Sequence, residues 1–191
     1  MAVTTVTIMI ENTTHDVAKF PVVDSGVAGA GYVVQPGVLQ PPVAGSSDVT
    51  TNFYARTTAS DIAGYRKLLT ANANTSTEYS GSCTPPPTDA CSFAIEEFAT
   101  DAGAMDGITM TAETVTVRYR AKKSAGVDPS HVTVELYHRT SGGVETLITS
   151  TDSADLGTSY ANYTWSPTIT KSWGTNERLV VKFIGVVVSF V

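Results

Sequence analysis

The side chains best suited to catalysis are few in this sequence and are scattered along it. Its three histidines are His15, His131 and His138. None belongs to an HExxH motif, and none stands in a nucleophile motif with a serine or cysteine. His131 opens a predicted strand and His138 lies toward its end, which are ordinary places for histidine. The histidines therefore predict no acid–base catalyst.

The acidic residues and glycines also lack the spacing that chemistry requires. Glu96 and Glu97 are adjacent, and adjacent side chains of a strand point to opposite faces, so they do not form an acid–base pair. Asp152 and Asp155 flank a turn without the D-x-D-x-D-G pattern of a calcium loop. The run GVAGAG at 26–31 is neither a dinucleotide-binding motif nor a P-loop. We therefore expect no enzyme activity, no cofactor and no metal site.

The two cysteines, Cys83 and Cys91, enclose the sequence CTPPPTDAC. Their spacing fits no common zinc motif, and no histidine lies nearby to complete one. A disulfide across this proline-stiffened loop is geometrically feasible. Synthesis in the cytoplasm disfavours it unless the protein later meets an oxidising environment. The sequence leaves the pairing open, and either state gives these residues a structural role.

Tyr163 and Trp165 are the residues that a carbohydrate-binding site would use. They stand two positions apart and so share one face of a predicted strand, and flat aromatic rings suit sugar rings. Large aromatic side chains more often anchor a core or a protein interface through the area that they bury. The sequence leaves both roles open and favours packing.

Composition indicates that β-strands must position these residues. Hydrophobic residues make up 42% of the 191 residues and charged residues only 16%, below the ~25% typical of soluble domains. Threonine, valine, serine, alanine and glycine take their place. Threonine and valine are β-branched and favour a pleated surface over a helix. The composition predicts an all-β protein.

Charge and hydropathy exclude two classes of partner. The net charge of -6 and a pI near 4.9 argue against general binding to nucleic acid or to an anionic membrane surface, because both need clustered cations. Residues 1–10 lack the basic start of a signal peptide. The apolar run at 179–191 is shorter than the ~20 residues of a membrane helix and suits a buried strand. We expect synthesis in the cytoplasm and no membrane anchor.

From residue 51 to 191 the pattern is that of one β-domain. Short strand-like segments alternate with turn signals. Nine such strands at this spacing predict an antiparallel sandwich, jelly-roll-like in type, and not a parallel α/β sheet. The expected strands are 53–57, 64–70, 76–82, 92–99, 109–122, 131–140, 144–151, 158–166 and 177–190.

The middle of the domain supports a sharper prediction. The segments 109–122 and 131–140 each alternate apolar and polar residues, and we expect them to pair as a hairpin with their apolar faces together. Arg118 would then lie opposite Glu135, a cross-strand pair that contributes roughly 0.2–1 kcal/mol. The SGG turn at 141–143 would lead into a third strand.

Residues 1–50 differ from the rest of the chain. TTVTIMIE alternates well enough for one strand, and the stretch that follows is rich in glycine and proline but dotted with apolar residues. Prolines cannot donate ladder hydrogen bonds and favour extended geometry, whereas a disordered linker would be more polar. We predict an extended arm that lies along a neighbouring molecule. Its expected contact residues are Val6, Ile8, Ile10, Tyr32, Val33, Val34 and Leu39.

Several segments together resemble a known family. FYARTTASDIAGYRKLLT, VTVELYHRTSGGVETLITSTDS and NERLVVKFIG are similar to parts of the jelly-roll-type virion proteins of tailed bacteriophages and related viruses. Those proteins carry a strand–RxxGG–strand hairpin and a later closing xRLVVK strand. The residues in matching places here are Arg139, Gly142, Gly143, Arg178, Leu179 and Lys182.

The resemblance implies a structural component of a virion, such as a capsid decoration protein, a head fibre or a tail-associated protein. Its expected partners are other virion proteins and copies of itself, and a trimer would suit a jelly-roll spike. The leading alternative is a receptor- or glycan-binding module of a viral tail or spike. A hydrolase with an unrecognised site is a more distant one.

Overall fold

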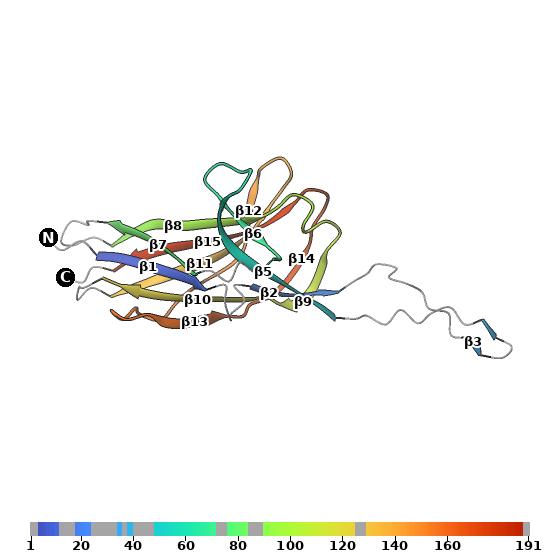
Figure 1. The fold of residues 1–191 in the computed structure, drawn as a ribbon, viewed down its shortest axis with the longest axis horizontal. Helices are drawn as coiled ribbons and strands as arrows, with labels where there is room; N and C mark the ends of the chain where they lie inside the picture. The colour runs from blue at the N-terminus through green and yellow to red at the C-terminus, as the bar shows by residue number, and fades with distance from the viewer. Residues whose placement is uncertain are drawn as a thin grey trace.

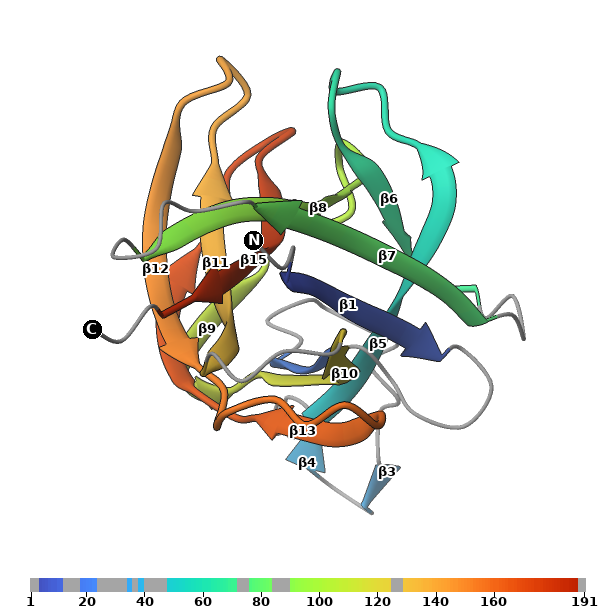
Figure 2. The ribbon, with the colours of Figure 1, turned by 90° about the vertical axis from the view of Figure 1, so that its left-hand side faces the viewer.

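The computed structural model describes eight stretches of the chain: residues 4–11, 18–23, 34–35, 38–39, 48–71, 76–83, 90–124 and 129–188. Within these stretches the residues form strands, turns and loops, and none is helical. The expected all-β class is confirmed. The strands build a sandwich-like body of two layers around a shared core (Figures 1 and 2).

The first layer has β10 at its centre. β13 pairs with one edge of β10, while β1 and then β2 pair with the other edge, and β7 pairs with the free side of β1. All of these pairs are antiparallel. The strands are β1 (Thr4–Glu11), β2 (Ala18–Val23), β7 (Ser76–Cys83), β10 (Thr116–Lys123) and β13 (Ala161–Trp165).

The second layer has the order β12-β11-β15-β8-β6. Its pairs are antiparallel except for β6 and β8, which run parallel. The strands are β6 (Arg66–Leu69), β8 (Cys91–Thr100), β11 (Ser130–Arg139), β12 (Glu145–Asp152) and β15 (Arg178–Val187).

β5 (Asp48–Ala59) connects the two layers. Its first half pairs with β2, from Val23↔Asp48 to Ala18↔Phe53, and its second half pairs with β6, beginning at Tyr54↔Leu69. One long strand thus passes from one layer into the other. Two further pairs lie outside these layers: β9 (Thr109–Thr114) with β14 (Thr168–Ser172), and β3 (Val34–Gln35) with β4 (Val38–Leu39).

Aromatic rings hold the two layers together at the core. Phe183 of β15 is fully buried and meets the rings of Phe98 and of Tyr119 edge to face, at centroid distances of 6.1 and 5.3 Å. Tyr79 of β7 packs against Phe98 at 5.6 Å. Edge-to-face contacts of this kind add about 0.5–1.5 kcal/mol to simple area burial. The alternating apolar residues of both layers therefore meet in one interior.

All nine expected strands have a counterpart, although the expected strand 109–122 is divided into β9 and β10. The expected hairpin of 109–122 with 131–140 is wrong. β10 pairs with strands of the first layer, and β11 pairs with β12 and β15 in the second. Glu135 lies beside Lys182 and not beside Arg118. The predicted faces are nevertheless right, because the buried residues of both strands point into the same core, from opposite sides. The next turn is confirmed, since β11 and β12 pair across Gly143, which has a φ of +90°.

The expected arm of residues 1–50 is wrong for its first part. Residues 4–11 form β1, which lies between β7 and β10, and Ile8 is fully buried opposite Ala121 and Tyr79. The alternation of apolar and polar residues favours a strand at 4–11, and β7 and β10 provide backbone hydrogen-bond partners on both of its edges. Backbone pairing therefore also places Val6 and Ile10 in the body: Val6 lies opposite Lys123 and Gly81.

The remaining predicted arm residues lie between β2 and β5. Tyr32 and Val33 lie outside the described residues. Val34 and Leu39 pair with each other in the small β3–β4 sheet. Figure 1 places this sheet well apart from the body. The apolar residues of 24–47 thus stand between β2 and β5 in the sequence and do not belong to a terminal arm.

Candidate functional site

The outer face of the second layer carries a dense polar cluster around Glu145, at the start of β12. Strand alternation directs these side chains outward, because their neighbours along each strand fill the core. One member, Tyr65, comes from the loop before β6. We name this group the Glu145 cluster, and its members are Tyr65, Glu97, Glu135, Tyr137, Arg139, Glu145 and Lys182.

Three donors converge on the Glu145 carboxylate. Tyr65 Oη donates to Oε1 over 2.7 Å, Arg139 Nη1 reaches the same oxygen at 2.7 Å, and Lys182 Nζ lies 2.8 Å from Oε2. The Lys182 ammonium also stands over the rings of Tyr65 and Tyr137, at 5.5 and 4.9 Å from their centroids. Such charge-assisted bonds are about twice as strong as neutral ones, so the cluster fixes its side chains in place.

The cluster shifts the titration of its own members. Burial opposes ionisation of Glu145, but the hydrogen bonds from Lys182, Tyr65 and Arg139 outweigh it and lower the pKa of the carboxyl. Burial, together with the bond to Glu145, raises the pKa of the Tyr65 phenol to about 12. The pKa of Lys182 is also raised, because its hydrogen bond with Glu145 overcomes the effect of burial. At neutral pH the Glu145 carboxylate and the Lys182 ammonium are therefore charged, and the Tyr65 phenol is neutral.

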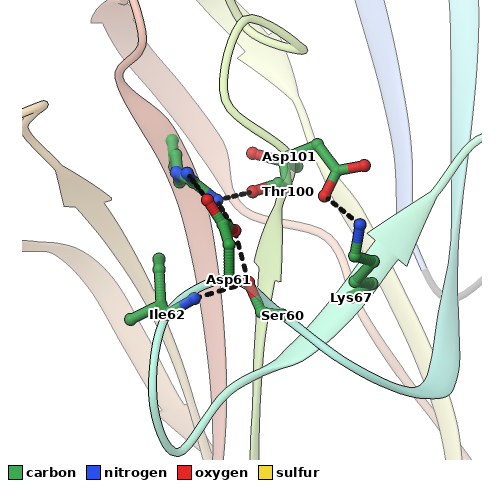
Figure 3. A network of polar contacts seen from close by, with 7 residues as sticks. Ser60, Asp61, Ile62, Lys67, Thr100 and Asp101 are labelled. Carbon is green, nitrogen blue, oxygen red and sulfur yellow. Dashed lines mark hydrogen bonds and ion pairs between the residues drawn. The ribbon is translucent and has the colours of Figure 1, made fainter.

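A second polar contact, the Asp61–Arg178 clasp, ties the β5–β6 loop to the start of β15. Figure 3 shows Asp61 in this loop, close to Thr100. Arg178 grips the Asp61 carboxylate with two bonds of 2.6 and 2.5 Å, and its Nη1 also donates to the Thr100 carbonyl over 3.1 Å. The hydrogen bond from Arg178 holds the pKa of Asp61 well below its ordinary value. Close by, Lys67 Nζ lies 3.0 Å from Asp101 Oδ1. The clasp has the two-bond geometry that arginine makes with carboxylates.

His138 has a structural partner as well. Its Nε2 lies 2.8 Å from Glu177 Oε2, and Glu177 also accepts a hydrogen bond from the Gly174 amide over 2.6 Å. The bond from the Gly174 amide, followed by that from His138, lowers the pKa of Glu177. His138 therefore fastens the loop that leads into β15, as expected of a strand-end histidine.

The outer face of the first layer carries a row of cations on β10, the basic stripe: Arg118, Arg120 and Lys122. They alternate with the buried Val117, Tyr119 and Ala121. The ring of Tyr160 lies under two of them, 5.4 Å from the Arg120 guanidinium carbon and 4.3 Å from Lys122 Nζ. Cation–π contacts of this kind contribute about 0.5–1 kcal/mol at exposed sites.

The structure turns Tyr163 and Trp165 toward the core. Tyr163 stacks on Tyr119 with a centroid distance of 5.4 Å and an interplanar angle of 17°, and Trp165 is half-buried against the same core. The exposed positions of β13 are Ala161, Asn162 and Thr164. This arrangement supports the packing role.

Cys83 and Cys91 form a disulfide with their Cα atoms 6.6 Å apart. Cys83 ends β7 in the first layer and Cys91 begins β8 in the second, so the bond fastens the two layers at one end. Thr4 and Val187 pair with these cysteines in the sheets. The pairing that the sequence left open is therefore made in this structure.

The candidate site residues that the sequence predicted do not lie together in one site. Sequence reasoning named some residues of the Glu145 cluster and of the basic stripe, but it did not predict these two groups. Most of their members are outward positions of predicted strands. Alternation alone could have marked those positions, but not which of them meet. Among the described residues, no group of three histidine, cysteine, aspartate or glutamate side chains is placed to hold a metal ion. The described part of the chain likewise contains no helix that could cross a bilayer.

Comparison with known proteins gave no relative to set beside these observations: no family model, no curated protein and no solved structure matches the chain.

Proposed function

We propose that this chain is a non-enzymatic structural protein of a virion, which attaches to other virion proteins and assembles with copies of itself. The attachment element is the segment between Val23 and Asp48. A capsid decoration, head-fibre or tail-associated role fits this description. Two features support this role: the resemblance of the β-domain to virion proteins and the position of that segment between β2 and β5.

One observation carries the attachment part of the proposal. Val23 and Asp48 are paired neighbours at the ends of β2 and β5, so the segment between them begins and ends at one point of the body. Between them, the described residues form only the β3–β4 sheet, which stands apart from the body in Figure 1. Val34 and Leu39 are apolar, and burial of apolar area against another molecule is favourable, so this segment suits attachment to a partner.

The polar clusters support a structural role over a chemical one. The carboxylates of Glu145 and Asp61 are committed to internal hydrogen bonds. Such satisfied networks make a surface rigid. A rigid body with a protruding segment can bind repeatedly across a lattice, where many weak contacts add to strong avidity.

The test is to remove the segment without touching the body. Residues 24–47 are replaced by a two-residue Asn-Gly turn, which suits the antiparallel pairing of β2 with β5. The variant is expected to keep the β-sheet circular dichroism spectrum and the thermal midpoint of the wild type. It is also expected to lose incorporation into particles, measured by mass spectrometry of purified virions.

A second variant replaces only Val34 and Leu39 by serine and so keeps the length of the segment. It is expected to incorporate poorly as well. Normal incorporation of the folded, shortened chain would disprove the attachment role of the segment. Binding of that chain to host glycans on an array would instead favour the receptor-binding alternative.

A further inference from the structure

The outer face of the second layer carries exposed apolar side chains, and we infer that it binds the attachment segment of a second copy of this chain. The attachment segment is residues 24–47, and the part that binds is its centre, residues 32–44. This inference rests on the proposed function, because it names a partner for the segment described there.

Apolar and aromatic groups adjoin one another on this face. Leu147 lies opposite Tyr137 in the β11–β12 pair and is 47% exposed, and Val144 in the adjoining turn is 64% exposed. Among the described residues, these two are the exposed large hydrophobic side chains. The ring centroids of Tyr65 and Tyr137 lie 5.5 and 4.9 Å from Lys182 Nζ, so two aromatic rings belong to the same face. Burial of such area against a partner is favourable.

The charged groups of this face already have partners within the chain. Lys182 Nζ lies 2.8 Å from Glu145 Oε2 and 3.5 Å from Glu97 Oε2. Arg139 Nη1 lies 2.7 Å from Glu145 Oε1. A charged ligand has to compete with these internal pairs, whereas an uncharged ligand leaves them in place. The face therefore suits a ligand that is apolar and uncharged.

The attachment segment has this chemistry. Residues 25–47 contain no Asp, Glu, Lys, Arg or His, although charged residues make up 16% of the chain. The centre of the segment, YVVQPGVLQPPVA at 32–44, is apolar and includes the pair Pro41 and Pro42. Prolines favour an extended chain, and aromatic surfaces bind proline-rich segments in that form. The segment and the face are therefore complementary in polarity and in charge.

The position of the segment favours a second copy as its partner. The segment begins after Val23 and ends before Asp48, and these two residues pair at one point of the body. Its described residues form the β3–β4 sheet, which stands apart from the body in Figure 1. Those residues thus do not cover the face of their own copy. Because each copy has one segment and one face, such contacts join two copies that exchange segments or a closed ring of copies.

The first experiment measures self-association of the full chain by sedimentation velocity over a range of protein concentrations. The wild type is expected to associate equally at low and high salt, because an uncharged segment makes the contact. Leu147→Ser is expected to weaken association about tenfold, since it removes apolar area from the face. Ala161→Ser is the control, because it makes an apolar-to-serine change at an exposed position of β13, in the first layer.

A synthetic peptide of residues 32–44 identifies the part of the segment that binds. Labelled with fluorescein and titrated with the full chain, the peptide is expected to bind the wild type and to bind Leu147→Ser about tenfold more weakly. Fluorescence anisotropy measures both affinities. Excess unlabelled peptide is expected to dissociate the wild-type oligomer. The same peptide with Val34→Ser and Leu39→Ser is the control and is expected not to compete.

A mixture of two variants tests whether the contact passes between copies. Leu147→Ser damages the face and keeps the segment, whereas the double variant Val34→Ser, Leu39→Ser damages the segment and keeps the face. Each alone is expected to be monomeric at concentrations where the wild type associates. Their mixture is expected to form dimers, because one intact segment meets one intact face. Circular dichroism and thermal midpoints establish that both variants are folded.

Three results would overturn the inference: a wild type that is monomeric at every concentration, a Leu147→Ser variant that associates and binds the peptide like the wild type, or a mixture that stays monomeric. Incorporation of the chain shortened between Val23 and Asp48 is measured in parallel. If that chain is lost from virions while the wild type does not self-associate, the attachment role stands and the partner of the segment is another virion protein.

Discussion

Phe93 shows how single residues decide the packing between strands. Its ring lies over Gly81 of β7 and Gly185 of β15, and a Cβ atom added at either glycine would overlap the ring. Neither glycine has a positive φ. Both glycines are therefore needed for space, and not for an unusual backbone conformation.

Substitution of Gly185 by alanine tests this packing. The new methyl group must displace the Phe93 ring, so Gly185→Ala is expected to lower the free energy of unfolding by about 1–3 kcal/mol. Urea denaturation monitored by circular dichroism measures the change. Gly142→Ala is the control, because its Cβ would meet only Thr140 Oγ1 at 3.8 Å. Equal stability of the two variants would contradict the assigned packing.

The Asp61–Arg178 clasp predicts a pH dependence. Arg178 lowers the pKa of Asp61 in the folded state, so the clasp stabilises the fold above about pH 4, where an unpaired aspartate is ionised. This stability is lost as the pH falls through the lowered folded value. Because Asp61 is largely exposed, we expect Asp61→Asn to cost only about 1 kcal/mol at pH 7 and progressively less below pH 4. Urea titrations at several pH values measure the difference, with Asp155→Asn as control.

Among the elements, β1 and β5 have positions in the sheets that their own sequences do not predict. β1 is a short alternating strand near the start of the chain, yet it has a neighbour on each side and contributes Ile8 to the core. β5 serves both layers because its two halves have different partners. In each case the role of the strand depends on where its neighbours come from.

Ile8→Ala tests the place of β1 in the core. Truncation of a fully buried isoleucine is expected to destabilise the protein by about 2–5 kcal/mol. Guanidinium denaturation gives the value, and Thr164→Ala on exposed β13 is expected to change it by about 0.5 kcal/mol or less. An Ile8→Ala protein as stable as the wild type would show that residues 4–11 are dispensable, as an external arm would be.

On the scale of the whole molecule, the two layers are joined by β5, by the aromatic core and by the Cys83–Cys91 disulfide. The disulfide links the last strand of the first layer's order, β7, to β8 of the second. It also lies where β1 begins and β15 ends. The bond thus fastens the layers at one end of the body.

Removal of this bond is expected to loosen the whole sandwich. Replacement of both cysteines by serine should lower the free energy of unfolding by about 2–3 kcal/mol, as expected for a loop of this length. Urea denaturation with and without reductant measures the effect. The reductant should lower the midpoint of the wild type to that of the serine variant and leave the variant unchanged. An unchanged wild-type midpoint would mean that the bond contributes nothing to stability.

The sequence by itself determined where most of the long strands form and which of their side chains are buried, but it did not predict β2 or β14. The alternation of Val132, Val134 and Leu136 with polar residues is a local property, because successive side chains of a strand point to opposite faces. The turn at 141–143 is equally local, since a glycine with positive φ closes it. For the same reason, alternation alone marks the outward positions of the basic stripe.

Only the tertiary structure decided which strands are neighbours. Alternation is satisfied equally well by a partner in the same layer and by one facing it across the core, so it could not distinguish a β10–β11 hairpin from the observed facing layers. Contacts such as Arg178 with Asp61 and Tyr65 with Glu145 join residues far apart in sequence. Their formation depends on how the whole chain closes around its core, and no local pattern encodes that closure.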